Sequence, residues 1–353
     1  MNTLKNFHTS IVAIPSATAW HLADLGEFRG RQDMFLNHTP QKLQVLREHA
    51  MIESAVSSNR IEGVEIDRSR VGTVIFGKPL LHDRNEEEIR GYRDALKEIY
   101  ENAAALPVSL ETILGFHRNC RYDVGDAGQL KEKEGDIIEK YPDGRIRIRF
   151  KTVAPEQTKP FLEELISLYN RSIEEKTIHP MIALAAFNLD FLCIHPFRDG
   201  NGRVSRLLLL QQCCLHGYNA GRYISLERLI EENKERYYET LELSSVGWHE
   251  AKHDPWPYIN YVLFILKSAY REFENRLARI NDSRGAKTQM IESAIQEFRE
   301  PFSFTRLERA CPGVSRDMIR HTLRNLQKQG VVECLGRGPG AEWRRKGNTL
   351  KRG

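Results

Sequence analysis

The sequence predicts a mainly α-helical protein that carries one β-hairpin and ends in a small winged-helix domain. Apolar residues recur with the helical period over most of the first 280 residues. Strand-like alternation interrupts this pattern in one segment, residues 136–150. Beyond residue 285, short helical segments are followed by two strand-like segments, and Lys and Arg become frequent. These three observations predict a helical body with an attached hairpin and a separate C-terminal domain.

The first long predicted helix begins at Pro40, because proline suits a first helical turn and the capping residue Thr39 precedes it. Apolar residues from Leu43 to Ala55 recur on one face, which predicts a core-facing helix as far as about Asn59. The same period predicts further helices near residues 85–104, 109–120, 156–173, 179–194, 201–216, 226–244 and 256–280.

A single hairpin is predicted for the helical body, over residues 136–150. Tyr-Pro-Asp-Gly at 141–144 has the residue types of a tight turn, and Arg-Ile-Arg-Ile-Arg-Phe follows at 145–150. Alternation with a period of two would place the two isoleucines and Phe150 on one face and the three arginines on the other.

Composition favours a globular protein in a reducing compartment. An apolar share of 41 % over 353 residues is enough for the core of one or two domains. The N-terminal residues lack the apolar stretch of a secretory signal, and the most apolar run, Met181 to Ile194, is too short to cross a bilayer. None of the six cysteines has a metal-like spacing, so reduced thiols are the simplest interpretation. We therefore expect a cytoplasmic protein that has no membrane partner.

Charge is distributed unevenly along the chain. Residues 283–353 carry 15 Lys or Arg against 7 Asp or Glu, although the net charge of the whole chain is only +4. A polar, turn-rich linker at 281–285 precedes this basic segment. We expect three regions, namely an N-terminal helical region (1–105), a central domain (106–280) and a winged helix-turn-helix (286–347).

The C-terminal region has the element order of a winged helix-turn-helix. Helices are predicted at 290–298, 305–310 and 315–329, with Ser303 or Thr305 as the cap of the second and Ser315 as the cap of the third. Cys-Pro-Gly-Val at 311–314 forms the turn between them. Two strands, 331–334 and 341–344, would flank a glycine-rich wing at 336–340.

The predicted third helix of this region is basic on one side and apolar on the other, where Met318, Ile319, Leu323 and Leu326 recur. A basic helix beside a basic wing fits the phosphates of duplex DNA. Many modules of this type contact proteins instead, so both kinds of partner stay open. The basic residues concerned are Arg316, Arg320, His321, Arg324 and Lys328 in the helix and Arg337, Arg344, Arg345 and Lys346 in the wing.

The segment His195-Pro-Phe-Arg-Asp-Gly-Asn-Gly-Arg-Val-Ser-Arg206 concentrates the chemistry of the chain. Two glycines separated by one residue, just before a predicted helix, form a loop that approaches an anion closely, and N–H groups at a helix start bind phosphate. Arg203 and Arg206 are spaced i, i+3 and so share one end of that helix. Asp199 is suited to a Mg²⁺ ion that also touches phosphates, and His195 is suited to proton transfer at neutral pH. This set meets the needs of phosphoryl or nucleotidyl transfer.

Each of these features alone is usually structural, since a lone Gly-x-Gly is most often a helix-entry turn and a lone histidine a satisfied core or surface residue. Their occurrence within twelve residues makes coincidence a poor explanation. We interpret Phe197 as a core residue that anchors the loop.

This segment matches the signature HxFx(D/E)GNGRxxR of the Fic family at every fixed position, and the chain resembles that family over roughly residues 40–270. The resemblance implies transfer of AMP from ATP to a Tyr, Ser or Thr hydroxyl of a target protein, with release of pyrophosphate. It also implies the following roles: His195 as general base, Asp199 as the Mg²⁺ ligand, Gly200, Asn201 and Gly202 as the anion hole, Arg203 for the β-phosphate and Arg206 for the γ-phosphate.

A second motif lies far upstream, at Ser58-Asn-Arg-Ile-Glu-Gly63, and resembles the inhibitory pattern (S/T)xxxE(G/N) of the same family. A helix C-terminus closed by Gly63 is by itself the commoner explanation of such a segment, and the two interpretations are compatible. The resemblance implies an inhibitory helix at about 40–63 whose Glu62 pairs with Arg206 and keeps activity low at rest.

Two further segments resemble parts of Fic proteins. The hairpin at 136–150 is similar to the flap that aligns a target segment, because a strand edge can pair with an extended peptide. An edge ribbon made soluble by arginines is the alternative. Tyr238, in Lys234-Glu-Arg-Tyr-Tyr238, resembles a residue beside the adenine pocket, and a buried aromatic pair is the alternative there. His117 is expected to pack or to form hydrogen bonds.

Three functional alternatives remain open at this stage. The chain is a protein adenylyltransferase, a DNA-binding regulator whose Fic site is vestigial or modifies the protein itself, or a Fic enzyme with another chemistry. That last class includes other nucleotides, phosphocholine transfer and removal of AMP, for which Glu62 is also a suitable group. Two further questions stay open: which protein is the target, with the chain itself among the options, and whether the chain forms a homo-oligomer.

Overall fold

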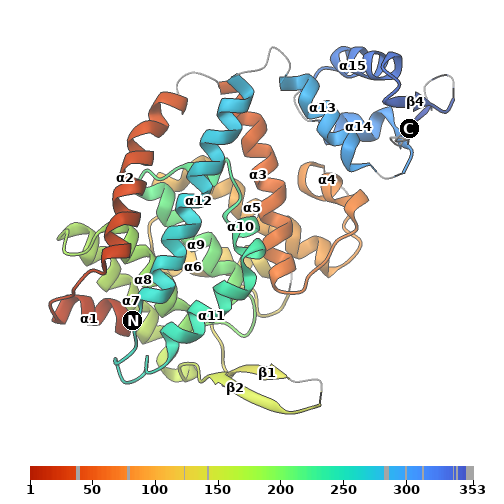
Figure 1. Cartoon of the computed structure of the whole chain (residues 1–353). Helices are drawn as coiled ribbons and strands as arrows, with labels where there is room; N and C mark the ends of the chain where they lie inside the picture. The colour runs from red at the N-terminus through yellow and green to blue at the C-terminus, as the bar shows by residue number, and fades with distance from the viewer. Residues whose placement is uncertain are drawn as a thin grey trace. The chain divides into compact units, whose positions relative to one another are not determined.

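The chain forms two compact units, Met1–Phe273 and Glu274–Gly353 (Figure 1). The computed structural model describes residues 1–36, 40–77, 80–122, 124–140, 143–281, 286–298, 300–311, 314–336, 338 and 341–346. No helix within these ranges is long and apolar enough to cross a membrane.

The first unit is built from α-helices with a single two-stranded hairpin among its described residues, as the sequence predicts. Its helices are α1 (Asn2–Thr9), α2 (Ser16–Leu36), α3 (Pro40–Ile61), α4 (Arg68–Phe76), α5 (Arg84–Asn102), α6 (Leu110–Arg121), α7 (Pro155–Glu174), α8 (Pro180–Ile194), α9 (Asn201–Leu215), α10 (Leu226–Glu232), α11 (Lys234–Ser245) and α12 (Trp256–Asn281), and its strands are β1 (Ile137–Lys140) and β2 (Ile146–Phe150). The residues of α12 from Glu274 onward belong to the second unit.

The predicted helices are present with small shifts of their ends, and one prediction is wrong. The helix expected at 226–244 is two helices, because α10 ends before Asn233 and α11 begins after it. The Asn233 side chain donates to the Leu229 carbonyl oxygen at 2.9 Å and so takes an acceptor from the helical ladder. Helices α1, α2 and α4 were not predicted, and α2 contains Gly26 and Gly30, which weaken a helical pattern.

Helix α8 forms the centre of the first unit and packs against α1, α7 and α9. Every residue from Met181 to Ile194 is buried. The two polar residues that interrupt this apolar run are satisfied internally. Asn188 donates to the Ser205 carbonyl oxygen at 2.7 Å. Asp190 accepts the N–H groups of Thr3 and Leu4, both at 3.1 Å, together with the Thr3 hydroxyl at 2.7 Å and the Trp248 indole N–H at 2.6 Å.

The hairpin pairs β1 with β2 in antiparallel register, with Ile138 opposite Ile148 and a bulge between Ile137 and Ile138. Arg147 and Arg149 both donate to Glu242 of α11, which ties β2 to that helix. The three residues of the predicted apolar face have different surroundings. Phe150 packs edge-on against Trp248, with ring centroids 6.2 Å apart. Ile146 and Ile148 are 62 % and 59 % exposed.

The second unit combines three helices with a three-stranded antiparallel sheet of order β3-β5-β4. The side chains of Ser303 and Ser315 accept backbone N–H groups of the second and third helices and so cap these helices, as predicted. Strand β3 was not predicted, because it is only two residues long. The elements are α13 (Ala286–Glu297), β3 (Phe302–Ser303), α14 (Phe304–Ala310), α15 (Arg316–Lys328), β4 (Val332–Cys334) and β5 (Glu342–Arg345).

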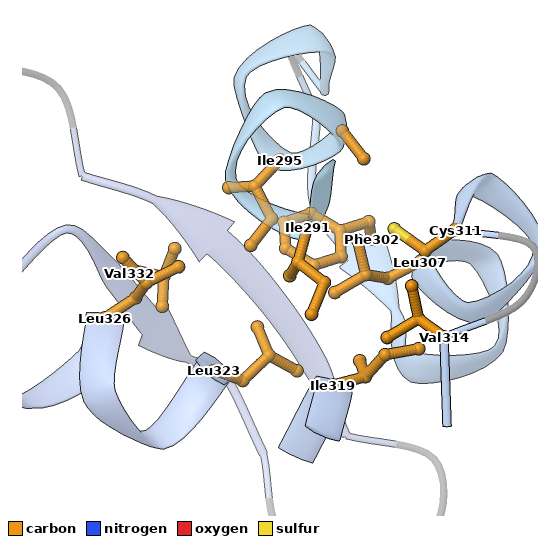
Figure 2. Close-up of a cluster of buried hydrophobic side chains, with 11 residues drawn as sticks. Ile291, Ile295, Phe302, Leu307, Cys311, Val314, Ile319, Leu323, Leu326 and Val332 are labelled. Carbon is orange, nitrogen blue, oxygen red and sulfur yellow. The ribbon is translucent and has the colours of Figure 1, made fainter. Parts of the chain in front are cut away.

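The core of the second unit lies between its helices and the sheet (Figure 2). Ile291 of α13, Leu307 of α14 and Ile319 and Leu323 of α15 point into it around Phe302. Burial of this apolar stripe leaves the basic side of α15 exposed.

Some predicted features lie outside the described residues. They are the cap Thr39, the turn residues Tyr141 and Pro142, the linker positions 282–285, the turn residues Pro312 and Gly313, and the wing residues Arg337, Pro339 and Gly340.

We expect Asp190→Ala to destabilise the first unit by about 3–5 kcal/mol, because four donors lose a buried charged acceptor. Urea unfolding followed by circular dichroism measures the change. Glu175→Ala removes a carboxylate from the exposed pair with Arg171 and is the control, with an expected cost below about 1 kcal/mol. Equal costs for the two variants would contradict a structural role of Asp190.

Candidate functional site

The loop between α8 and α9 begins with His195, whose backbone is left-handed at φ 53° and ψ 62°. Its N–H donates to the Phe191 carbonyl oxygen at 3.0 Å and closes the end of α8. Glycine usually takes this position, because the left-handed region costs other residues about 1–2 kcal/mol. The turn brings the imidazole to the wall of a cavity.

The His195 imidazole is neutral at physiological pH and has a defined tautomer. Its Nδ1 lies 3.4 Å from the Leu192 carbonyl oxygen, and a carbonyl only accepts, so Nδ1 carries the proton and Nε2 has the free lone pair. Burial, and then the nearby charge of Lys131, lower the pKa of His195 to about 4. At pH 7 the group is therefore ready to accept a proton at Nε2.

His117 supports the loop from α6, as the sequence analysis expects of a packing and hydrogen-bonding histidine. Its ring stacks on Phe197 with centroids 3.8 Å apart and planes at 4°. Nδ1 accepts the Gly128 N–H at 2.9 Å, so Nε2 carries the proton and donates to the Asp199 carbonyl oxygen at 3.1 Å. Burial lowers the pKa of His117 to about 4, and the ring stays neutral.

Asn201 closes the loop with its side chain. Its Oδ1 accepts the Phe197 N–H at 2.9 Å, and its Nδ2 donates to the Phe197 carbonyl oxygen at 2.8 Å. Gly200 precedes α9 at φ 83°, a conformation that suits glycine. The first N–H groups of α9 have no partner within the helix, so this end of the helix attracts anions.

Asp199 is half-exposed at the start of α9 and is surrounded by arginines. Its Oδ2 accepts from Arg121 and lies 3.7 Å from Arg84, and its Oδ1 accepts the Gly200 N–H at 2.6 Å. Burial alone would raise the pKa of Asp199, but Arg203 and Arg121 outweigh burial and lower it. The carboxylate is therefore ionised at neutral pH.

Arg203 is fully buried and belongs to an ion-pair network. Its Nη1 donates to Glu88 at 2.6 Å and to the Asn59 side-chain oxygen at 3.3 Å, and its Nη2 reaches Asp199 at 3.5 Å. Glu88 also contacts Arg121 at 3.4 Å. This network fixes the position of Asp199 relative to α5 and α6.

Arg206, one turn further along α9, is held by the segment that contains Glu62. Its Nε donates to Ser58 Oγ at 2.8 Å, and its Nη2 donates to the Ser58 carbonyl oxygen at 2.9 Å and to Glu62 Oε1 at 2.8 Å. Its Nη1 is buried and has no hydrogen-bond partner within the described part of the chain. The carboxylate of Glu62 lies against Gly202 so closely that a Cβ atom there would collide with it.

The turn that carries Glu62 follows α3 and closes that helix, so the structural interpretation of this segment is correct. Gly63 is left-handed at φ 82°, and its N–H donates to the Arg60 carbonyl oxygen at 3.0 Å. Lys234 of α11 donates to the Ile61 carbonyl oxygen at 3.1 Å, and Arg60 pairs with Glu231 of α10 at 3.0 Å. These contacts hold Glu62 in front of α9.

One cavity of about 960 Å³ joins several of the predicted site residues. Arg206 is buried and forms an ion pair with Glu62. Beside this pair, the wall of the cavity is formed by Glu62. The sequence-predicted residues that line the cavity are Glu62, His195, Gly202 and Tyr238, together with Ile137, Ile138, Arg149 and Phe150 of the hairpin.

The site geometry agrees with the comparison with known proteins. Residues 107–213 match the Fic/DOC family. The match covers less than a third of the chain. The range includes α6, the hairpin, α8 and most of α9, and therefore the whole loop from His195.

Curated relatives of the Fic/DOC domain are distant. Protein adenylyltransferase fic-1 of Caenorhabditis elegans is 29 % identical over 198 residues, which are 54 % of this chain and 34 % of that protein. Protein adenylyltransferase and cysteine protease IbpA of Histophilus somni (strain 2336) is 21 % identical over 219 residues, which are 59 % of this chain and 5 % of that protein. The chain thus spans about a third or less of the length of these relatives.

Solved structures share the fold. A Fic family protein from Desulfovibrio desulfuricans G20 is 22 % identical, with a TM-score of 0.59 over 95 % of this chain and 98 % of that chain. Fic-1 from Caenorhabditis elegans is 22 % identical, with a TM-score of 0.55 over 73 % of this chain and 71 % of that chain. The Fic fold extends beyond the matched range.

Sequence reasoning missed the residues of the Fic/DOC domain and its neighbours that support the motif. Glu88 follows Glu86 and Glu87 and resembled part of an acidic first turn. Its spacing of four residues from the buried Tyr92 places it on the apolar stripe of α5, which was a usable signal. For Arg84, Arg121 and Lys131 no comparable pattern exists in the sequence. Their contacts arise only when α5, α6 and the hairpin come together.

The contact between Glu62 and Gly202 predicts an interaction that unfolding experiments can measure. Gly202→Ala should displace the Glu62 carboxylate and cost about 1–2 kcal/mol in the otherwise unchanged chain, and close to nothing in a Glu62→Gly background. Urea unfolding of the four proteins gives the coupling. Gly115→Ala in α6, where a Cβ meets open space, is the control and should be insensitive to Glu62. A cost of Gly202→Ala that does not depend on residue 62 would disprove the contact.

Proposed function

We propose that the chain is a protein adenylyltransferase that transfers AMP from ATP to a side-chain hydroxyl of a target protein and that Glu62 keeps it in a state of low activity. The observation that carries the proposal is the single cavity that joins the free Nε2 of His195 to the anion-attracting start of α9 at Gly202. The Fic/DOC match and the adenylyltransferase relatives support the reaction class.

The phosphates of ATP would bind at the start of α9. The N–H groups of the first turn point out of the helix there, and the helix dipole favours negative charge. Arg203 and Arg206 add two cations at the same end of the helix. Arg206 Nη1, which is buried and has no partner among the described residues, is a donor that a γ-phosphate would satisfy.

In the transfer step, the oxygen of the target hydroxyl attacks the α-phosphorus and its proton moves to His195 Nε2. The bond between the α-phosphorus and the bridging oxygen breaks, and pyrophosphate leaves with the electron pair. The depressed pKa of His195, about 4, keeps the imidazole in the accepting form throughout the physiological range.

The residues present also fit the magnesium ion that Fic enzymes use. Mg²⁺ with a nucleotide usually takes one or two protein carboxylates and completes its shell with phosphates and water. Asp199 is ionised, half-exposed and adjacent to the start of α9, so it would hold the ion. When bound, Mg²⁺ would neutralise phosphate charge. Arg84 and Arg121 share Asp199 Oδ2 and would keep the carboxylate oriented.

The hairpin and α11 would form the two remaining parts of the substrate site. Each strand of a two-stranded sheet has one unpaired edge, and a target segment could extend the sheet by backbone pairing. Tyr238 lines the cavity from α11 and would border the adenine. Burial and Glu62 raise the pKa of Tyr238 to about 12, so its hydroxyl stays protonated.

Glu62 would inhibit by taking the place of a phosphate. Its carboxylate has the charge of the missing anion, lies against Gly202 and accepts from Arg206. ATP that binds beside it would meet a like charge and would lose a donor for the γ-phosphate. Removal of this competitor favours productive binding of ATP.

We expect Glu62→Gly to raise AMP transfer about tenfold to a hundredfold, which corresponds to a competing contact of roughly 1–3 kcal/mol. The measurement is the incorporation of label from α-labelled ATP into a lysate and into the chain itself, with mass spectrometry of the products. Glu65→Gly alters an exposed glutamate three residues away and is the matched control.

Two further experiments and two contrary outcomes decide the interpretation. Glu62→Gly/His195→Ala should lose the transfer, and chelation of Mg²⁺ should abolish it in Glu62→Gly. Equal rates for the unchanged chain and Glu62→Gly would rule out inhibition by Glu62. Persistent AMP transfer without His195 would disprove its role as base.

A second candidate function, duplex DNA binding, is favoured by the exposed face of α15. We propose that the second unit is a winged helix-turn-helix. Ile319, Leu323 and Leu326 are buried in its core, so the basic residues of α15 face outward. Arg316 pairs with Glu308 at 3.3 Å and Arg320 with Asp317 at 3.2 Å. The exposed basic residues of this helix are Arg316, Arg320, His321, Arg324 and Lys328.

We expect Arg324→Ala and Lys328→Ala each to weaken binding of labelled duplex DNA by the full chain, with the slope of log K against log salt reduced by about 1 for each lost phosphate contact. Fluorescence anisotropy over a range of salt concentrations measures both. Arg309→Ala changes an exposed arginine of α14 and is the control. No binding at low salt would favour a protein partner for this unit.

A further inference from the structure

Beyond the residues of the motif, we propose that Lys131 is a positioning residue that fixes the catalytic orientation of His195 and connects it to the base of the hairpin. The inference rests on the proposed function, in which His195 accepts the proton of the target hydroxyl. Lys131 lies between α6 and β1 and is buried at the wall of the same cavity.

Lys131 holds the backbone on both sides of His195. Its main-chain N–H donates to the Pro196 carbonyl oxygen at 2.9 Å, and its ammonium donates to the Ile194 carbonyl oxygen at 3.2 Å. One residue thus holds the peptide group that precedes the base and the peptide group that follows Pro196. The position of the His195 backbone between these two points determines where the imidazole lies.

This support answers a conformational need of the loop. His195 takes the left-handed conformation that glycine normally takes at a helix end. The last carbonyl groups of α8 lack helical partners, and the negative end of the helix dipole lies among them. The ammonium of Lys131 satisfies the Ile194 carbonyl and places a positive charge at that end of the helix. These contacts stabilise the left-handed backbone of His195 at a position that glycine normally occupies.

The same ammonium reaches the hairpin. Its second hydrogen bond goes to Thr152 Oγ1 at 2.9 Å, just beyond β2. The Thr152 hydroxyl in turn donates to the Gly135 carbonyl oxygen at 3.0 Å, and its N–H donates to Asp136 at 3.3 Å, both just before β1. Lys131 therefore links the two ends of the hairpin with His195. Through this link, a target segment that pairs with the hairpin would be positioned relative to the His195 imidazole.

The charge of Lys131 gives the link a signature in the titration of His195. No carboxylate lies within ion-pair distance of Lys131 among the described residues, and burial lowers the pKa of its ammonium to about 8. Burial and then Lys131 lower the pKa of His195, whereas the Leu192 carbonyl, Glu62 and Asp199 raise it. Removal of the Lys131 charge should therefore move the His195 pKa upward.

The experiment uses Lys131→Met, which keeps most of the apolar stem, and Lys131→Gln, which keeps a hydrogen-bond donor without the charge. Lys97→Met is the control, because Lys97 is an exposed lysine of α5 that does not line the cavity. All three are prepared in the full Glu62→Gly chain. The His195 ring signal is assigned with His195→Ala and titrated by NMR, and kcat and the KM for ATP are measured separately.

We expect Lys131→Met and Lys131→Gln to raise the His195 midpoint by about 0.5–1 pH unit. We also expect Lys131→Met to lower kcat about tenfold to a hundredfold with little change in the KM for ATP, as for a misplaced base. Lys131→Gln should retain more of kcat than Lys131→Met, because its amide can still donate to a carbonyl oxygen. Lys97→Met should change none of these quantities.

An unshifted His195 midpoint in both Lys131 variants would overturn the inference. So would a kcat for Lys131→Met equal to that of Lys97→Met. The NMR readout does not require an active enzyme, so it decides about Lys131 even if Glu62→Gly transfers no AMP. In that case the proposed function fails and the contact between Lys131 and His195 is still tested.

Discussion

The arrangement of the first unit depends on one electrostatic constraint, the two buried guanidinium groups in the first turns of α9. Arg203 is 1 % exposed and Arg206 is 3 % exposed, and each needs an anion in place of water. Glu88 supplies it for Arg203 and Glu62 for Arg206. The two carboxylates differ in burial: Glu88 is 3 % exposed, whereas Glu62 is 30 % exposed. Of these two carboxylates, Glu62 can return to water at the lower cost, so in the proposed function its place would be the one available to a phosphate.

The difference in exposure between Glu88 and Glu62 follows from where each carboxylate lies in the fold. Glu88 lies within α5, whose apolar stripe packs in the core and keeps the carboxylate in place. Glu62 lies on the turn after α3, which is held by backbone and surface contacts such as Lys234 with the Ile61 carbonyl. Lys234 and Tyr238 belong to the same helix, α11. In the proposed function, a base bound beside Tyr238 and the turn that carries Glu62 would therefore both contact this helix, which would couple nucleotide binding to the release of Glu62.

The sequence predicts the helices of the body, the hairpin and the motif well, because these depend on local periodicity and on short patterns. It fails where one side chain competes with the helical ladder, as Asn233 does between α10 and α11. It also fails for Lys131, whose partners Ile194 and Thr152 lie 63 and 21 residues away in the chain. Long-range polar contacts of this kind have no period, so only the folded chain brings them together.

The exposure of Glu62 also limits how strongly it can regulate. If the contact between Glu62 and Arg206 contributed less than about 1 kcal/mol, as a surface ion pair does, Glu62 would be released from Arg206 in much of the population at rest. A contact above about 5 kcal/mol would need a ligand that prefers the open state by roughly four orders of magnitude. A partly exposed carboxylate on a buried guanidinium falls between these limits. In the proposed function, a triphosphate would carry more charge than one carboxylate and would also satisfy Arg206 Nη1, so its binding, or a partner that moves α3, would shift the balance.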